Sequence, residues 1–357
     1  MKGFLKALLY RPVTLISVII LILLYLMMIF AEFVAPYGPG TSFSDKSFHP
    51  PAVSWYSQEL GFGPQVQDRA VINEINWKYA RIKGTGKRVQ FFVKGEPYKL
   101  WGLIPAERHL FGMSEGDQST PVFLMGSDNL GRCLFSRILY GSRISLTIGF
   151  IGIAISMTLA ITFGGLAGFY GGKIDWLIMR FSEFFILVPG LYLILFLRSI
   201  LSRDMTSGQS FMIITIILSF VGWPGSARLI RGMVHSIKRE DFISNAVLEG
   251  IPTLNIIFKQ IIPQMSSIII VSIALGIPGF ILGETVLSYL GLGIVDPAVS
   301  WGSLINREIS TLSNLRNFPW FLIPGLFLLV TTLAFNFLGD LLRDYLDPYH
   351  RDKGGLR

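Results

Sequence analysis

The sequence predicts an all-α, polytopic membrane protein with six transmembrane helices, because of its composition and because of how its apolar residues are grouped. Hydrophobic residues make up 51% of the 357 residues, charged residues only 15%, and the mean hydropathy is strongly positive. A soluble domain of this length carries more charge. The apolar residues form long blocks of about 20 residues or more, enough to cross roughly 30 Å of hydrocarbon as helices. Helices are expected because a backbone in lipid must satisfy its own hydrogen bonds.

Five of the six blocks contain no charged residue: 12–31, 144–172, 205–227, 260–283 and 317–339. The sixth, residues 176–197, has Arg180 and Glu183 near its start, one helical turn apart, so we expect a local ion pair there. The first block follows basic residues, as a signal peptide would. Its apolar core is too long for one, however, and the sequence after Glu32 makes a poor cleavage site. A first transmembrane helix is therefore expected over residues 12–35.

Lysine and arginine in short loops mark the cytoplasmic side of a membrane protein. With the N-terminus inside, the inner segments hold 14 of these residues and the two short outer loops hold 4. This predicts cytoplasmic tails at 1–11 and 341–357. The other 13 lie in the long outer segment 32–143, and long translocated domains largely escape the charge rule. The net charge of +8 therefore reflects membrane topology rather than nucleic-acid binding.

The outer segment predicts a small extracytoplasmic α/β insertion over residues 36–122, followed by a connecting segment at 123–143. It carries too many aromatic residues for a disordered linker, and residues 88–94 alternate as a short strand before Gly95. The insertion either covers the outer surface or serves as a platform for a solute-delivering partner. One cysteine, Cys133, and four scattered histidines give no spacing suited to a metal site. Trp301 and Trp320 are expected at the membrane interface.

Residues 144–340 form the predicted five-helix transport core, and its most informative part is the cytoplasmic loop 228–263. Apolar residues recur at helical spacing between Phe242 and Val247, and Gly250 then supplies a stop with Pro252 after it. A second apolar run leads to Pro263. The pattern predicts two short helices joined by a glycine turn, which could either enter a groove on a partner protein or lie on their own bundle.

This loop resembles the EAA loop of ATP-binding cassette (ABC) importer permeases, whose pattern is E-A-A, three residues, G, nine residues, I-x-L-P. Here the matching positions are Ser244-Asn-Ala246, Gly250 and Gln260-Ile-Ile-Pro263. Other segments resemble the second permease of the dipeptide/oligopeptide (peptide/nickel) branch. They are Gly126-Ser-Asp-Asn-Leu-Gly-Arg132, Ser136–Leu146, Gly168-Phe-Tyr-Gly-Gly172, Trp223–Gly232, Leu287–Gly293, Ser300-Trp-Gly302, Ala334–Asp340 and Leu342–Pro348. The resemblance covers about residues 120 to 350, with residues 31–39.

The resemblance implies a permease subunit of an ABC importer for peptides or related small solutes, in a bacterial or archaeal inner membrane. It implies pairing with a homologous second permease, docking on two cytoplasmic ATPase subunits, and delivery of cargo by an extracytoplasmic solute-binding protein. The chain itself would be no enzyme and would bind no cofactor, since ATP and Mg would sit on the partner subunits. The residues expected to contact the ATPase are Phe242, Ser244, Asn245, Ala246, Glu249, Gly250, Ile261 and Pro263.

Two departures from the pattern bear on these expectations. Ser244 stands where the EAA glutamate is usual, so Glu240, Asp241 or Glu249 would have to supply the charge, or the contact is mainly apolar. Cys133 replaces the acid that usually follows Gly-Arg. Glu284, near the outer end of the fifth span, is a candidate for the translocation path because ionisable groups at membrane depth are usually functional. The alternative is that the Glu284 carboxylate is solvated at the helix end or pairs with Arg307.

A secondary transporter and a membrane-embedded enzyme are the competing functions. A transporter that works without ATP should carry an ion relay within its spans, and only Glu183 and Glu284 are candidates there. An enzyme needs a clustered nucleophile, base or metal site, and residues 36–122 show none in their sequence. The sequence therefore favours the importer permease over both of these hypotheses.

Overall fold

The computed structural model describes residues 7–58, 60–73, 77–82, 84–113, 120–200, 205–309 and 312–346. Most of both predicted tails, with the basic residues counted there at 2, 6, 351, 353 and 357, lies outside the described residues, as do Lys83 and Arg203. The chain divides into two units. One comprises Met1–Leu21, Leu146–Leu287 and Val330–Arg357, and the other comprises Ile22–Ser145 and Ser288–Leu329.

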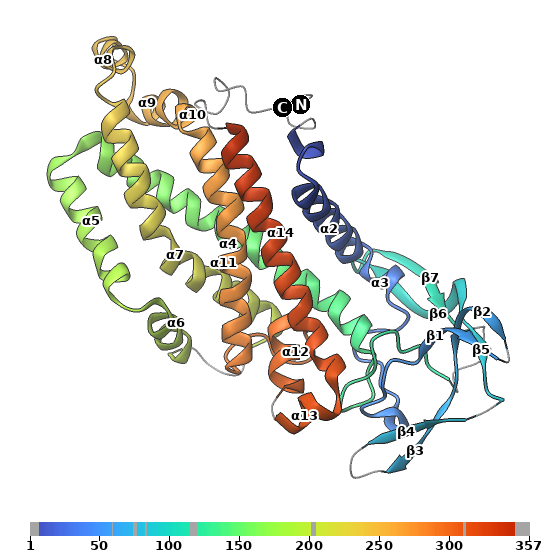
Figure 1. The fold of residues 1–357 in the computed structure, drawn as a ribbon. Helices are drawn as coiled ribbons and strands as arrows, with labels where there is room; N and C mark the ends of the chain where they lie inside the picture. Colours follow the sequence, from blue (N-terminus) through green and yellow to red (C-terminus); the bar gives the residue numbers. More distant parts are fainter. Residues whose placement is uncertain are drawn as a thin grey trace. The chain divides into compact units, whose positions relative to one another are not determined.

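Within the described residues, five helical elements are long and apolar enough to span a membrane, which confirms five of the predicted blocks. They are α2 (Pro12–Ile29), α4 (Leu134–Tyr170), α7 (Ser207–Ile237), α11 (Ser266–Tyr289) and Pro319–Leu346, the last containing α14 (Ile323–Leu346) (Figure 1). The helix α4 begins ahead of its apolar block and α7 continues beyond its own. A hydropathy pattern does not detect such extensions, because their polar residues lie beyond the hydrocarbon core of the membrane.

The sixth predicted span is divided into α5 (Gly172–Leu187) and α6 (Gly190–Ser199), which meet at an angle of 93°. The break falls at Val188, whose backbone is extended (φ −79°, ψ 125°), directly before Pro189. The ring of a proline disfavours a helical conformation in the residue before it, so a single straight helix over 176–197 was the wrong expectation. The predicted ion pair between Arg180 and Glu183 is present at 2.8 Å.

The bent pair accounts for a sixth crossing because of where its neighbours end. Lys238 Nζ, just past the end of α7, donates to the carbonyl oxygen of Phe169, at the end of α4, over 2.5 Å. The two helices therefore end on the same side, and the chain between them has to return across the membrane. Arg11 and Asp344 also form an ion pair, at 2.6 Å, so α2 begins where α14 ends. Both observations fit an even number of crossings.

The insertion is built from strands. β1 (Val53–Ser57), β2 (Gly61–Val66) and β5 (Lys87–Arg88) form one antiparallel sheet, β3 (Arg69–Asn73) pairs with β4 (Lys78–Arg81), and β6 (Gln90–Leu100) pairs with β7 (Ile104–Gly112). In the described part of the insertion, the helical component of the expected α/β arrangement is limited to the 3₁₀ turn Ser44–Lys46.

The predicted strand 88–94 is divided in the structure, since Arg88 belongs to β5 and β6 begins at Gln90 and continues through Gly95 to Leu100. A Cβ at Gly95 would lie 2.6 Å from the imidazole ring of His109, so the glycine permits a close cross-strand approach rather than ending the strand.

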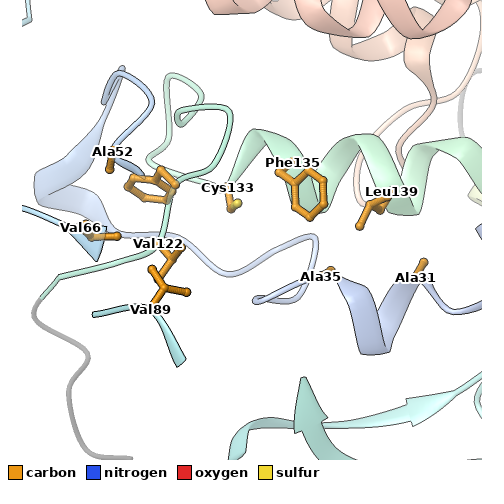
Figure 2. Close-up of a cluster of buried hydrophobic side chains, with 10 residues drawn as sticks. Ala31, Ala35, Ala52, Val66, Val89, Val122, Cys133, Phe135 and Leu139 are labelled. Carbon is orange, nitrogen blue, oxygen red and sulfur yellow. The ribbon is translucent and has the colours of Figure 1, made fainter. Parts of the chain in front are cut away.

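The insertion shares one hydrophobic core with the short helix α3 (Ala31–Val34) and the start of α4. Figure 2 shows this cluster, whose buried members are Ala31, Ala35, Ala52, Val66, Val89, Val122, Phe123, Cys133, Phe135 and Leu139. Cys133, at the position where an acid was expected, is a buried free thiol in this core. The insertion is thus packed onto the membrane-proximal helices of its own unit.

Trp301 corrects one of the two expected interfacial tryptophans. It opens α12 (Trp301–Glu308), is fully buried, and donates its indole N–H to the carbonyl oxygen of Ile138 over 3.0 Å. Its backbone N–H donates to Ser145 Oγ at 3.1 Å. The side chain therefore joins α12 to the start of α4 instead of lying against lipid headgroups.

Charged side chains gather around Asp296 in the same unit. Arg132 and Arg137 each approach its carboxylate to 3.6 Å, and Arg307 forms a shorter ion pair with it. Asp128 accepts from Arg132 Nε at 2.6 Å. Arg307, which was considered as a partner for Glu284, thus pairs with Asp296.

Glu308 ends α12 beside this cluster, fully buried, with Oε1 lacking a hydrogen-bond partner. Burial, helped by the charge of Asp128, raises the pKa of this carboxyl to about 7, although Arg137, Arg307 and Arg132 act in the opposite direction. The folded protein therefore binds this proton more tightly than the unfolded chain does. This stabilising contribution is complete below the ordinary carboxyl pKa and is lost as the pH rises through about 7.

The Glu308→Gln variant should remove that pH dependence. We expect the wild type to lose stability relative to the variant, on the order of 2–3 kcal/mol, between pH about 5 and about 8. Thermal unfolding of the two proteins in detergent measures the difference. Glu107→Gln, at an exposed ion pair with Lys94, is the control and should follow the wild type. Parallel curves for wild type and Glu308→Gln would contradict the protonated assignment.

Candidate functional site

The candidate site is the segment Asp241–Gln264, which follows α7 and which we call the α8–α10 segment. Its base is held by contacts on both sides of α7. Arg231 donates from Nε to Asp175 Oδ1 of α5 at 2.6 Å and from Nη2 to the other oxygen, a two-point ion pair. Lys238 is held by the end of α4, as described above. These contacts tie the end of α7 to α4 and α5.

Two glycines let α4 and α7 approach closely just below this base. A Cβ at Gly164 would lie 2.5 Å from the carbonyl oxygen of Ala227, and one at Gly168 would lie 2.6 Å from that of Arg231. Gly164 and Gly168 are four residues apart and so share a helix face, as in the small-residue motifs of packed transmembrane helices. The end of α7 is therefore closely packed on α4.

The first helix of the segment, α8 (Asp241–Leu248), is largely exposed. Only Ile243 and Ala246, three positions apart on one face, are buried among its eight residues. Figure 1 shows α8 beyond the end of α7, projecting clear of the spanning helices of that unit. The helix is attached along one narrow edge and free on the rest of its surface.

A glycine turn ends α8 with its own hydrogen bonds. Gly250 has φ +76°, its N–H donates to the carbonyl oxygen of Val247 at 3.0 Å, and the N–H of Ile251 donates to that of Ala246 at 3.1 Å. This is a Schellman motif, in which the residue after the C-cap takes a left-handed conformation. The predicted helix stop at Gly250 is confirmed, and the turn fixes the direction of the chain that leaves α8.

The second half of the segment is continuous helix with a wide turn. α9 (Thr253–Ile256) leads through a π-helical turn (Ile257–Ile261) into α10 (Ile262–Gln264). The π turn contains Lys259, whose carbonyl would meet the ring of Pro263 in a regular α-helix, so widening relieves that clash. Ile257 is buried, and a Cβ at Gly165 of α4 would lie 3.1 Å from its side chain.

The predicted site residues divide between the two faces of the segment. Ala246 and Ile261 are buried and hold it in place, whereas Phe242, Ser244, Asn245, Glu249, Gly250 and Pro263 are exposed. Ser244, which stands for the EAA glutamate, makes only a long contact of 3.5 Å to the carbonyl oxygen of Glu240. Glu240, Asp241 and Glu249 are exposed and remain candidates for the missing charge.

The exposed surface includes apolar side chains that, apart from Phe242, were not among the predicted contact residues. Large hydrophobic residues lie open on this segment: Phe242, Val247, Leu248, Leu254 and Phe258, with Leu248 the most exposed at 85%. We call these five the exposed apolar face. The signal for them was the apolar content of α8 and of residues 254–258, since short helices attached along one edge cannot bury all of their apolar residues.

Glu284 lies apart from this segment, on α11. Its side chain is fully buried, one residue after Gly283, where a Cβ would lie 2.9 Å from Leu218 of α7. The side chain is buried in protein rather than exposed to solvent. Its role in a translocation path stays a prediction.

Comparison with known proteins assigns the chain to a family. Residues 160–351 match the family model described as the inner membrane component of binding-protein-dependent transport systems, a range that contains the α8–α10 segment. The chain belongs to this permease family. Residues 1–51 match the N-terminal TM domain of oligopeptide transport permease C.

Curated relatives agree with that membership. The permease is 39% identical to the oligopeptide transport system permease protein OppC of Haemophilus influenzae over 63% of its own length and 70% of the relative. It is 38% identical to the dipeptide transport system permease protein DppC of Bacillus subtilis, over 62% and 68%. It is 36% identical to DppC of Lactococcus lactis, over 71% and 74%. The protein is thus a multi-pass inner membrane permease.

Proposed function

We propose that this permease is the second permease subunit of an ABC importer for peptides, and that the α8–α10 segment couples it to a separate ATPase. The names of its relatives, oligopeptide and dipeptide transport permeases, support the cargo class. The observation that carries the coupling role is the exposed apolar face on a helix that projects from the bundle.

The geometry suits transmission of force from a partner. Filling a groove on an ATPase with the exposed apolar face would contribute roughly 1.5–3 kcal/mol for each large side chain that becomes fully buried. The base of the segment is tied to α4 and α5 by Lys238, Arg231 and the packing of Ile257 on Gly165. A displacement of α8 is therefore passed to the spans instead of being absorbed in a flexible loop.

The partners follow from this assignment. A homologous second permease completes the translocation path, two cytoplasmic ATPase subunits bind ATP and Mg, and a solute-binding protein delivers cargo on the insertion side. The chain contributes position and mechanical linkage, and the hydrolysis occurs on the ATPases. The excess of Lys and Arg in the inner loops supports a cytoplasmic α8–α10 segment and cytoplasmic termini.

The Leu248→Asp variant tests the docking role. Placing a carboxylate in the middle of an apolar contact should cost about 2 kcal/mol or more, which is a loss of affinity of more than tenfold. We expect the variant to insert in the membrane at normal levels but to lose its ATPase subunits during purification, with uptake of a radiolabelled tripeptide falling in parallel.

Phe62→Asp is the matched control, because Phe62 is an equally exposed apolar side chain, at 80%, on strand β2 of the insertion. It should retain the ATPases and the uptake. Normal retention of the ATPases by Leu248→Asp would show that the contact lies elsewhere on the chain.

A further inference from the structure

The hairpin formed by β6 and β7 carries an unusually apolar and exposed tip. Trp101, Gly102 and Leu103 connect the paired residues Leu100 and Ile104. The side chains of Trp101, Leu103 and Ile104 are 51%, 81% and 62% exposed. Water-exposed loops are usually polar, so three such residues within four positions indicate a contact outside the chain.

The position of Trp101 fixes the level of this tip along the first span. Its indole N–H donates to the carbonyl oxygen of Ile29, the last residue of α2, over 2.9 Å, and its backbone N–H donates to Glu32 Oε1 at 3.2 Å. Arg143 pairs with Glu32 and lies over the indole ring, 4.4 Å from its centroid. A tryptophan with charged neighbours at the end of a span is typical of the headgroup level.

A groove lies between the hairpin and the membrane-spanning helix α2. It has a volume of about 490 Å³ and lies between the hairpin residues Tyr98, Leu100 and Ile104 and the α2 residues Leu23 and Leu26. Leu23 lies about 9 Å along the helix axis from Ile29, since each residue advances roughly 1.5 Å. With 18 residues, α2 is just long enough to cross the hydrocarbon, so Leu23 lies inside it.

The lining of the groove suits a hydrocarbon occupant. Its one polar side-chain atom, the hydroxyl of Tyr98, already donates to the carbonyl oxygen of Arg108 at 2.7 Å. Leu23, Leu26 and Phe30 of the adjoining chain are exposed, so the groove is continuous with an apolar helix surface. Next to the tip, Lys99 is exposed and could meet a lipid phosphate.

We propose that the tip of the β6–β7 hairpin, Leu100–Ile104, inserts into the bilayer leaflet on the insertion side, and that its groove with α2 holds a phospholipid acyl chain. Trp101 and Arg143 mark the headgroup level, and Leu103 and Ile104 lie below it among the acyl chains. The insertion is thereby anchored to the membrane at its hairpin. This holds whatever solute the importer carries.

Depth-dependent fluorescence quenching in the assembled transporter tests the proposal. Leu103→Cys, in a Cys133→Ala background, is labelled with an environment-sensitive fluorophore and reconstituted in phosphatidylcholine–phosphatidylglycerol liposomes. We expect lipids brominated on their acyl chains to lower its emission by about half, because apolar groups of interfacial segments lie roughly 5–10 Å into the headgroup–acyl boundary. Aqueous iodide should have little effect.

Phe62→Cys, on β2, is the control and should respond to iodide but not to brominated lipid. Each other outcome at position 103 overturns the proposal. Quenching by iodide would place the tip in water, and resistance to both quenchers would show that another subunit covers it. Ile104→Cys provides a second label position if Leu103→Cys fails to assemble with the other subunits.

Discussion

Replacing Gly250 with valine is expected to uncouple transport while leaving the membrane-spanning helices folded. Gly250 has φ +76°, and a left-handed conformation costs an L-residue about 1–2 kcal/mol, with β-branched side chains the worst placed. The strain is relieved by unwinding the end of α8, which displaces the exposed apolar face. We expect uptake of a radiolabelled tripeptide to fall roughly tenfold or more.

A graded pair of substitutions separates backbone strain from loss of a contact. No atom lies within 4 Å of a Cβ added at Gly250, so crowding makes no contribution. Asparagine tolerates the left-handed region, and Gly250→Asn should therefore retain most of the uptake. Equal activity of the valine and asparagine variants would rule out the turn as the mechanical element.

Insertion of a flexible segment after Gly250 is the more severe form of the same test. It should leave the chain in the membrane and its ATPases attached or nearly so, yet break the link between hydrolysis and uptake. Normal uptake by such a variant would overturn the coupling assignment.

The second large effect is expected at the contact between α4 and α7. Gly164→Leu would place a Cβ 2.5 Å from the carbonyl oxygen of Ala227 and a larger side chain beyond it, so the helices would have to separate. Overpacking of this kind costs about 1–3 kcal/mol, and more where backbone blocks the new atoms. We expect a lower yield of folded protein and a lower midpoint of thermal unfolding in detergent.

Gly232→Leu is the matched control on the facing helix. It lies in α7, where an added Cβ meets no atom within 4 Å. The same change in size should leave the unfolding midpoint close to that of the wild type. A similar loss in both variants would mean that leucine is tolerated poorly in these helices for reasons other than the close approach.

Much of the helical frame was predictable because the signals are local. A charge-free block of sufficient length predicts a span, and five such blocks became spanning helices. The helix stop at Gly250 was also predictable, since a glycine with a proline two residues later is typical of a helix end. The bend at Val188 also had a local signal, which is Pro189. The span was predicted from the length and charge of the apolar block alone, and this criterion takes no account of a proline.

Other features depended on which distant segments meet. Trp301 reads as an interfacial anchor from its residue type, yet it is buried because Ile138 supplies an acceptor for its indole N–H. In the candidate site, the spacing of α8 predicted an amphipathic helix but not which apolar residues would stay exposed. The exposed residues could be identified only after the structure showed that Ile243 and Ala246 form the buried edge of α8.

The spans, the short helices after α7 and the turn between them follow from local sequence, because hydrophobic length and turn chemistry act within a few residues. Three further features became known from the folded chain: Gly164 and Gly168 pack against α7, the insertion shares a core with α3 and α4, and Trp101 bonds to the end of α2. Those outcomes depend on close approaches between segments far apart in the chain, which no local pattern encodes.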